Sequence, residues 1–265
     1  MDVLSILYPV LSLGGLALLF GLGLGYAGVK FKVNEDPRIP LVRDALPGAN
    51  CGGCGFAGCD ALAAAIVEGK AKPNACPVGG DASARKISEI VGLAVEIGRH
   101  MVAFVRCNGN SNTSVFWYDY VGMQDCRAET HLAAGGPKAC GYGCLGSGSC
   151  ARVCRFGAIT VVDGVAVVDR EKCTACGVCV QECPKGLIAM VPYDNYVRVA
   201  CNSRDNGKAV RANCSVGCIG CRICERACGY DAVHVNEFVA RIDYGKCELC
   251  GDCAGKCPTK AIVCE

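Results

Sequence analysis

Cysteine is the residue type in this chain whose number and spacing could support chemistry. The chain has 25 cysteines in 265 residues, and most of them fall in C-x-x-C runs. Disulfide scaffolds and metal proteins both reach this density, but the clustered spacing, the odd count and the Pro or Gly residues beside the runs favour metal. Four thiolates at such spacings can hold a zinc ion or an iron–sulfur cluster, so both kinds of site must be weighed.

Three runs have the pattern C-x2-C-x2-C-x3-C, at residues 173–183, 218–228 and 247–257. This pattern is typical of bacterial two-cluster ferredoxins, in which the fourth cysteine of a run binds the neighbouring cluster. Three thiolates within seven residues surround one cube-shaped iron–sulfur cluster, and the next turn directs the fourth thiolate to the neighbouring cluster. A zinc site has no use for such a crossed ligand. The predicted ligand sets are Cys173, Cys176 and Cys179 with Cys154; Cys218, Cys221 and Cys224 with Cys257; and Cys247, Cys250 and Cys253 with Cys228.

A fourth run, GCLGSGSCARVC at residues 143–154, has Ser147 where the second cysteine is expected. Cys140 lies four residues before Cys144 in a glycine-rich loop that could bring it to the cluster. We therefore expect a ligand set of Cys140, Cys144, Cys150 and Cys183. The alternative is that Cys140 is an incidental thiol, since Cys214 precedes Cys218 in the same way where no replacement is needed. That alternative leaves a three-cysteine [3Fe-4S] cluster or no cluster.

A separate group of cysteines lies near the N-terminus, with the spacing C-x2-C-x4-C-x16-C and a proline after the last member. The glycines between the first three allow the backbone to wrap closely and to direct N–H groups at cluster sulfurs. This arrangement suits a [4Fe-4S] cluster, with zinc as the alternative. Its ligands would be Cys51, Cys54, Cys59 and Cys76.

The elements that must position these ligands can be read from the pattern. A helix is expected after Cys59, with Asp60 near its N-terminus, and a second one over 82–98, where apolar residues recur at helical spacing. The segments 143–161, 172–191, 217–235 and 246–264 are repeats of one unit. Strand–turn–strand pairs are expected within 159–169, around an Asp-Gly turn, and within 233–243, around Asn236-Glu237.

Residues 3–29 form a run without charged residues, and this run is long enough for a membrane-spanning helix. A signal peptide would have a positive start, a shorter apolar run and a cleavage site, so we expect an anchor. Lys30, Lys32, Arg38 and Arg43 follow the run, and positive residues stay on the cytoplasmic side. We therefore expect a single-pass protein of the cell (inner) membrane, in contact with lipid through this helix, with its iron–sulfur region cytoplasmic.

Other features of the sequence exclude some functions. The net charge of +2 without a basic stripe argues against nucleic-acid binding. No G-x-G-x-x-G opens a helix after a strand, and no acid–base or nucleophilic constellation appears, so the chain has no catalytic site of its own. Five cysteines stay without an assigned role and are expected to be buried free thiols: Cys107, Cys126, Cys201, Cys214 and Cys264. Cys107 with Cys126 could form a further site, but their spacing is not C-x-x-C.

In order along the chain, the apolar helix, CGGCGFAGC at 51–59, GCLGSGSCARVC and two ferredoxin modules resemble the B-type subunit of Rnf complexes. These are ion-translocating ferredoxin:NAD+ oxidoreductases, and the two modules are similar to the longer, clostridial-type form of the subunit. Arg155 and Gly229 depart from the proline that usually follows the fourth cysteine. The resemblance implies an electron-transfer subunit that takes electrons from reduced, soluble ferredoxin. It would pass them to membrane and peripheral subunits that reduce NAD and translocate ions.

The whole sequence therefore predicts an α+β protein with five [4Fe-4S] clusters. Its expected parts are a transmembrane anchor (1–29), a linker (30–48), a small helical four-cysteine Fe–S domain with its following helix (49–106), a connecting segment (107–139) and two tandem ferredoxin modules (140–200 and 201–265). Two other functions fit parts of the pattern. One is an iron–sulfur wire in another membrane oxidoreductase, such as a hydrogenase complex, and the other is a zinc-binding scaffold that carries no electrons.

Overall fold

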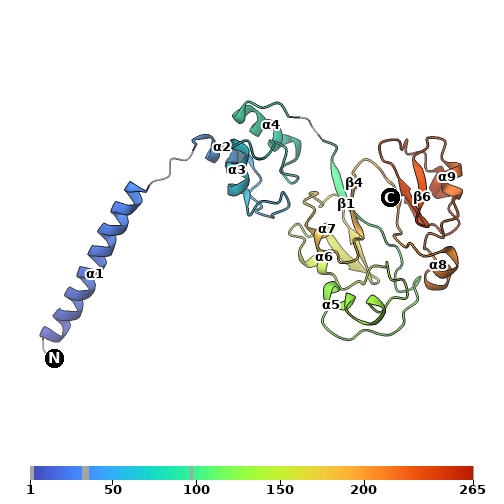
Figure 1. The fold of residues 1–265 in the computed structure, drawn as a ribbon, viewed down its shortest axis with the longest axis horizontal. Helices are drawn as coiled ribbons and strands as arrows, with labels where there is room; N and C mark the ends of the chain where they lie inside the picture. The colour runs from blue at the N-terminus through green and yellow to red at the C-terminus, as the bar shows by residue number, and fades with distance from the viewer. Residues whose placement is uncertain (1–2, 32–35, 96–97, 265) are drawn as a thin grey trace.

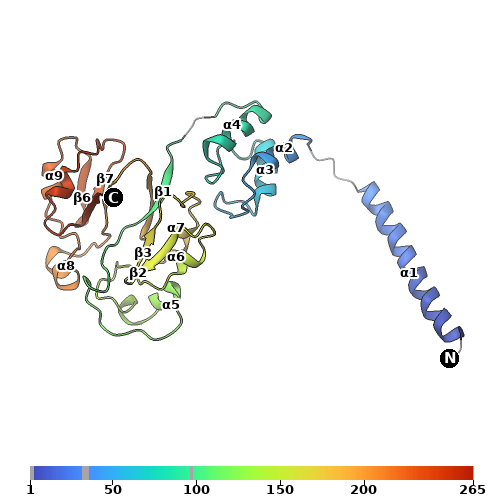
Figure 2. The same ribbon diagram turned by 180° about the vertical axis from the view of Figure 1, so that it is seen from behind.

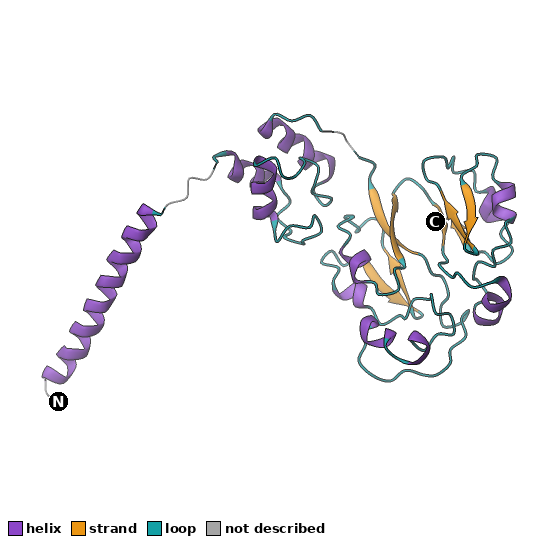
Figure 3. Ribbon diagram, viewed as in Figure 1, coloured by secondary structure: helices purple, strands orange, loops and turns teal. Residues whose placement is uncertain are grey.

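The computed structural model describes residues 3–31, 36–95 and 98–264. A long N-terminal helix stands apart and leads to a small helical domain, which is followed by two modules of short strands and helices that lie side by side (Figure 1). Helices and strands are mixed in the two modules, and the N-terminal part is helical (Figure 3). The protein is α+β, as the sequence predicts.

The N-terminal helix α1 spans Val3–Lys30. Its segment Val10–Lys30 is long and apolar enough to cross a membrane, and none of it is buried inside the protein. Leucines such as Leu22 and Leu24 are therefore exposed along it. An apolar helix of about 40 Å with no protein around it is the form expected of a membrane anchor. Lys32, one of the positive residues expected to flank the anchor, lies outside the described residues.

The helical domain consists of α2 (Arg38–Ala45), α3 (Cys59–Val67) and α4 (Gly80–Val91), with α2 packed against both of the others. Its core holds Val42, Leu62, Ile66 and Ile87 beside buried cysteines. Helix α3 begins as predicted, but α4 ends before residue 98 because Gly92 takes the left-handed conformation that terminates a helix. The predicted linker over 30–48 is too long, because α2 lies within these residues and is part of the helical domain.

The first ferredoxin module has two antiparallel strand pairs. β1 (Met101–Val105) pairs with β4 (Ile188–Pro192), and β2 (Ile159–Val162) pairs with β3 (Val165–Val168) across the expected Asp-Gly turn. Its helices are α5 (Cys126–Thr130), α6 (Ser149–Arg152) and α7 (Val178–Glu182), with a 3-10 turn at Ala133–Gly135. Since β1 belongs to this module, the expected boundaries at 107 and 140 are corrected: the module begins near residue 101.

The second module repeats this plan. β5 (Val197–Val199) pairs with β8 (Ile262–Cys264), and β6 (Val233–Asn236) pairs with β7 (Val239–Ile242). Its helices are α8 (Gly207–Asn213), α9 (Ile223–Ala227) and α10 (Asp252–Gly255). The turn between β6 and β7 is at Glu237 and Phe238, both with positive φ, one residue later than expected. The module begins before residue 201, because β5 pairs with its last strand. Figure 2 shows the corresponding pairs β2–β3 and β6–β7 from behind.

Cysteines occupy the centre of each of these three parts. Each hydrophobic core contains buried cysteines packed among Val, Ile and Ala side chains. With aromatic residues at 6% of the chain, aliphatic and thiol side chains make up most of the interior. The folding of these parts therefore depends on the group that binds the thiols, as in small metalloproteins.

Candidate metal centres

The N-terminal cysteine set lies at the start of α3 and in the loop that returns to it. The amide of Cys59 donates to the Asn50 side chain over 2.8 Å, which holds the start of the helix, and the amide of Gly79 donates to Cys76 Sγ over 3.3 Å. Burial raises the pKa of Cys76, and the charges of Cys54 and Cys59 act in the same direction. Cys54, Cys59 and Cys76 pack together in the core of the helical domain, so the structure brings together three of the four members of the predicted set.

Two further cavities are each lined by four cysteines. In each cavity, three cysteines come from one run and the fourth comes from the sister run of the same module. The first is lined by Cys154, Cys173, Cys176 and Cys179, and the second by Cys218, Cys221, Cys224 and Cys257. The structure thus brings together the members of the third and fourth predicted sets, including the crossed fourth cysteine.

The fifth predicted set surrounds Cys253 on α10. Burial raises the pKa of Cys253 to about 12, and the neighbouring charges of Cys224, Cys228 and Cys247 raise it as well. Cys250 is exposed to solvent, so this site lies nearer the surface than the others. Cys224 belongs to the fourth set, and the two sites of the second module are therefore adjacent.

The second predicted set needs a correction. The cavity at this place is lined by Cys126, Cys144, Cys150 and Cys183, whereas Cys140 lines a different cavity. Burial raises the pKa of Cys150 to about 12, with Cys144, Cys126 and Cys183 contributing in that direction. Cys126 therefore takes the place for which the sequence suggested Cys140. It had no recognisable spacing, because it comes from a helix 18 residues before Cys144.

Helix α5 delivers Cys126, and several contacts fasten this helix to the run that lacks a cysteine. The Asp125 side chain caps the helix by accepting from the amides of Arg127 and Ala128. The amide of Cys126 donates to Ser149 Oγ over 2.9 Å, and Arg152 forms an ion pair with Asp125 at 3.0 Å. These contacts hold the start of α5, and with it Cys126, beside the cavity.

The spacing in the sequence could not explain why Ser147 stands where a cysteine is expected. Its hydroxyl donates to the carboxylate of Glu129 on α5, and both side chains are buried, with Glu129 only 1% exposed. A buried carboxylate needs a donor, and Ser147 supplies one. The missing cysteine is thus replaced by a serine that anchors the helix carrying the substitute thiol.

Backbone amides point at many of these sulfurs. Four N–H···S hydrogen bonds, each 3.4 Å long, reach members of the predicted sets, with donors Ala103, Ala158, Leu187 and Ala232 and acceptors Cys173, Cys154, Cys183 and Cys228. Such bonds stabilise a thiolate and tune the reduction potential of a cluster bound to it. The donor sets therefore fit thiolate-bound clusters.

The spacing of the thiols bears on the choice between zinc and iron–sulfur. Within the part of the chain that the structure describes, no three His, Cys, Asp or Glu side chains converge as the ligands of a single ion would. A zinc ion holds its thiolates about 2.3 Å from one centre. The four thiolates of a [4Fe-4S] cube each bind a different iron and stand farther apart. The fourth cysteine that crosses from the sister run, for which a single ion has no use, favours the cluster.

The N-terminal domain meets the first module beside two of these sites. A Cβ on Gly53 would lie 2.2 Å from the Cys176 carbonyl oxygen, so only glycine fits there. Arg155 donates to the carbonyl oxygens of Ala49 and Asn50 over 3.2 and 2.8 Å. The arginine that replaces the usual proline therefore binds the cysteine loop of the other domain.

Comparison with known proteins agrees with these centres. Residues 46–78 match the family model described as "Putative Fe-S cluster", and residues 142–187 and 217–261 each match "4Fe-4S dicluster domain". The chain is 50% identical to the B-type subunit of the Na(+)-translocating ferredoxin:NAD(+) oxidoreductase complex of Acetobacterium woodii, over 97% of this chain and 78% of that one. It is 44% identical to the B-type subunit of the ion-translocating oxidoreductase complex of Methanosarcina acetivorans, over 94% and 95%.

A third relative is the B-type subunit of the proton-translocating ferredoxin:NAD(+) oxidoreductase complex of Clostridium ljungdahlii, 41% identical over 99% of this chain and 93% of that one. These similarities extend over almost the whole chain, from the apolar helix to the last cysteine run. The chain therefore belongs to the family of B-type subunits of Rnf-type ion-translocating ferredoxin:NAD(+) oxidoreductase complexes, in which it is an electron-transfer subunit.

Proposed function

We propose that this subunit accepts electrons from reduced ferredoxin and passes them along at least five [4Fe-4S] clusters toward the NAD-reducing and ion-translocating subunits. The observation that carries the proposal is the repeated four-cysteine cavity. In two cavities three thiols come from one run and the fourth from its sister run. In the other cavity two thiols come from one run, one from the sister run and one from α5. Such cavities offer four thiolates and, among the described residues, are lined by no histidine or carboxylate, which suits outer-sphere electron transfer.

The proposed ligand sets follow the cavities and neighbouring thiols described above. Relative to the prediction from sequence, Cys126 replaces Cys140 in one set. The sets are Cys51, Cys54, Cys59 and Cys76; Cys126, Cys144, Cys150 and Cys183; Cys154, Cys173, Cys176 and Cys179; Cys218, Cys221, Cys224 and Cys257; and Cys228, Cys247, Cys250 and Cys253.

The sites form a sequence through the N-terminal domain and the first module. Burial raises the pKa of Cys176, and the charge of Cys51 in the N-terminal set raises it further. The charge of Cys179 in turn contributes to the raised pKa of Cys150, so the two sites of the first module are adjacent. A cluster in each set would therefore have a neighbour to exchange electrons with.

Membrane attachment and orientation belong to the same proposal. Helix α1 would anchor the subunit in the cell membrane beside the other subunits, and the positive residues that follow it, Lys30, Arg38 and Arg43, would keep the clusters on the cytoplasmic side. Soluble ferredoxin is a cytoplasmic carrier, and this orientation would give it access to the clusters.

The experiment uses the full chain purified without oxygen. At least about twenty iron and twenty acid-labile sulfide ions per chain are expected, as five cubes contain, and reduced ferredoxin should bleach the visible absorbance. Zinc with negligible sulfide would instead identify a structural scaffold. Iron-loaded protein that reduced ferredoxin cannot bleach would refute the proposed electron donor while leaving the clusters in place.

A further inference from the structure

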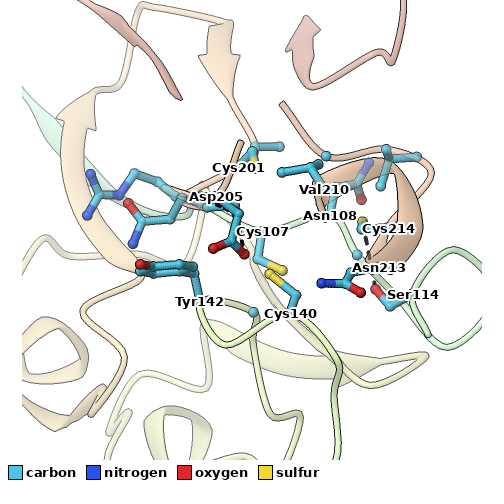
Figure 4. A pocket seen from close by; sticks show the side chains of 18 residues that line it. Cys107, Asn108, Ser114, Cys140, Tyr142, Cys201, Asp205, Val210, Asn213 and Cys214 are labelled. Atoms are coloured by element: carbon cyan, nitrogen blue, oxygen red, sulfur yellow. Dashed lines mark hydrogen bonds between the residues drawn. The ribbon is translucent and has the colours of Figure 1, made fainter. Parts of the chain in front are cut away.

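Five cysteines remain outside the proposed sets: Cys107, Cys140, Cys201, Cys214 and Cys264. Four of them, all except Cys264, line one cavity between the two ferredoxin modules. Figure 4 shows the sulfurs of Cys107 and Cys140 turned toward each other, with Cys201 and Cys214 on other sides of the same space. Cys264 is exposed at the end of β8.

The four thiols are close enough to act together. A Cβ on Gly109 would lie 3.1 Å from Cys214 Sγ and 3.8 Å from Cys107 Sγ, so both sulfurs border the space that this glycine leaves. Burial raises the pKa of Cys140, and the charges of Cys107 and Cys214 raise it further. Burial also raises the pKa of Cys201 to about 11, with Cys107 again among the neighbours that contribute.

Each module contributes an equivalent pair of cysteines to this cavity. Cys107 lies two residues after the end of β1, and Cys201 lies two residues after the end of β5. Cys140 and Cys214 each lie four residues before the first cysteine of their module's leading run. The two halves of the cavity are thus related by the same internal repeat that relates the modules.

The hydrogen bonds repeat as well. The amide of Cys144 donates to Cys107 Sγ over 3.4 Å, and the equivalent amide of Cys218 donates to Cys201 Sγ over 3.2 Å. Cys144 and Cys218 are themselves members of proposed cluster sets. Each half of the cavity is therefore in direct contact with a neighbouring site, one in each module.

Backbone hydrogen bonds hold the modules together around this cavity. They run from Asn108 to Ala200 over 3.1 Å, from Val115 to Asn213 over 2.9 Å and from Ser215 to Thr113 over 2.9 Å. The cavity is thus enclosed by segments that the fold holds in place, and its thiols are pre-positioned for a ligand.

The size and the charge of the cavity suit a cube. Its volume of about 20 Å³ is similar to the volumes of the cavities of the second, third and fourth sets, at about 20, 20 and 10 Å³. Beside it, the buried ammonium of Lys138 donates to the carbonyls of Gly109, Cys144 and Gly164 over 2.6, 2.7 and 3.1 Å. This positive charge would offset the negative charge of a cluster held by four thiolates.

We propose that Cys107, Cys140, Cys201 and Cys214 hold a further [4Fe-4S] cluster, which connects the clusters of the two modules. The site takes one electron from a cluster of one module and gives one to the other, with no bond made or broken and no proton held. This inference rests on the proposed clusters in the neighbouring sets. Six sets of four then account for 24 of the 25 cysteines, and Cys264 is the one left over.

The test compares Cys214→Ala with Cys264→Ala as the matched control, in the full chain purified without oxygen. The unaltered chain and the control should hold about 24 irons and as many sulfides, and Cys214→Ala should lose up to four of each or show the oxidised EPR signal of a [3Fe-4S] cluster. Equal iron, sulfide and spin counts in both variants would overturn the proposal.

Native mass spectrometry of the unaltered chain gives an answer even if the variant does not fold. The mass of six cubes is expected, whereas five cubes, or five cubes with one zinc ion, would overturn the inference and leave the proposed function intact. Few or no cubes would instead overturn the proposed function itself. The connecting role has a separate readout, which is the bleaching of visible absorbance by a substoichiometric amount of reductant. The control should bleach in one phase and Cys214→Ala in two phases. A single phase in both variants would refute the connecting role.

Discussion

The proposed ligand role of Cys126, in place of the cysteine that is missing at Ser147, can be tested by moving the ligand back into its run. Gly146 in the loop at Ser147 and Gly220 in its sister loop of the second module both have positive φ. Both glycines also lie against the following hairpin turn, so a side chain at either would meet a carbonyl oxygen at 2.7 or 3.0 Å. A cysteine at 147 would thus occupy the position that Cys221 has in its own cavity.

The expected magnitudes are set by the contents of one cube. Cys126→Ala removes one of the four thiols of its cavity and should cost up to four irons and four sulfides per chain, with one reduced-state spin. The double variant Cys126→Ala with Ser147→Cys should recover them, because four thiols again face the cavity. Iron and sulfide assays with an EPR spin count on dithionite-reduced protein measure both effects.

Cys140→Ala provides the matched comparison. It should also lose a cluster, but Ser147→Cys should not restore that loss, since Cys140 lines the cavity between the modules. Cys126 is not a ligand if Cys126→Ala keeps its full iron content. The same follows if Ser147→Cys restores the cluster in Cys140→Ala but not in Cys126→Ala.

Three other predictions concern stability and electron transfer. Ser147→Ala leaves the buried Glu129 carboxylate without this donor and should cost about 1–3 kcal/mol, seen as a lower guanidinium midpoint for loss of visible absorbance; an unchanged midpoint would contradict the anchoring role. Gly53→Ala puts a methyl group against the Cys176 carbonyl and should slow reduction of the N-terminal cluster in stopped-flow absorbance at unchanged iron content. Gly98→Ala, with open space around its Cβ, is the control, and equal rates in both would count against the junction. Removal of the clusters with chelator and oxidant should abolish the strand signal in circular dichroism and leave mainly the helical signal of α1; retained strand signal would show that the cores do not need the clusters.

Much of this architecture could be predicted from the sequence because it depends on local spacing. Three cysteines within seven residues must surround one centre whatever the rest of the chain does, and an Asp-Gly pair between β-branched residues specifies its own turn. The apolar run before Lys30 forms a helix by its composition alone. In the same way, the internal repeat indicated which cysteines of sister runs would cross between sites.

Only the tertiary structure could indicate the proposed ligands that come from outside the runs. Cys126 reaches its cavity because α5 is held there by Ser149, Arg152 and the buried Ser147–Glu129 contact, and no spacing in the sequence encodes that approach. The cavity between the modules gathers thiols from residue 107 to residue 214, which only the packing of one repeat against the other could bring together. The sequence by itself therefore determined that this is an iron–sulfur electron carrier, because short-range spacing defines a cluster motif. The completion of two of the proposed sites depends on contacts between segments far apart in the chain, and these exist only in the folded protein.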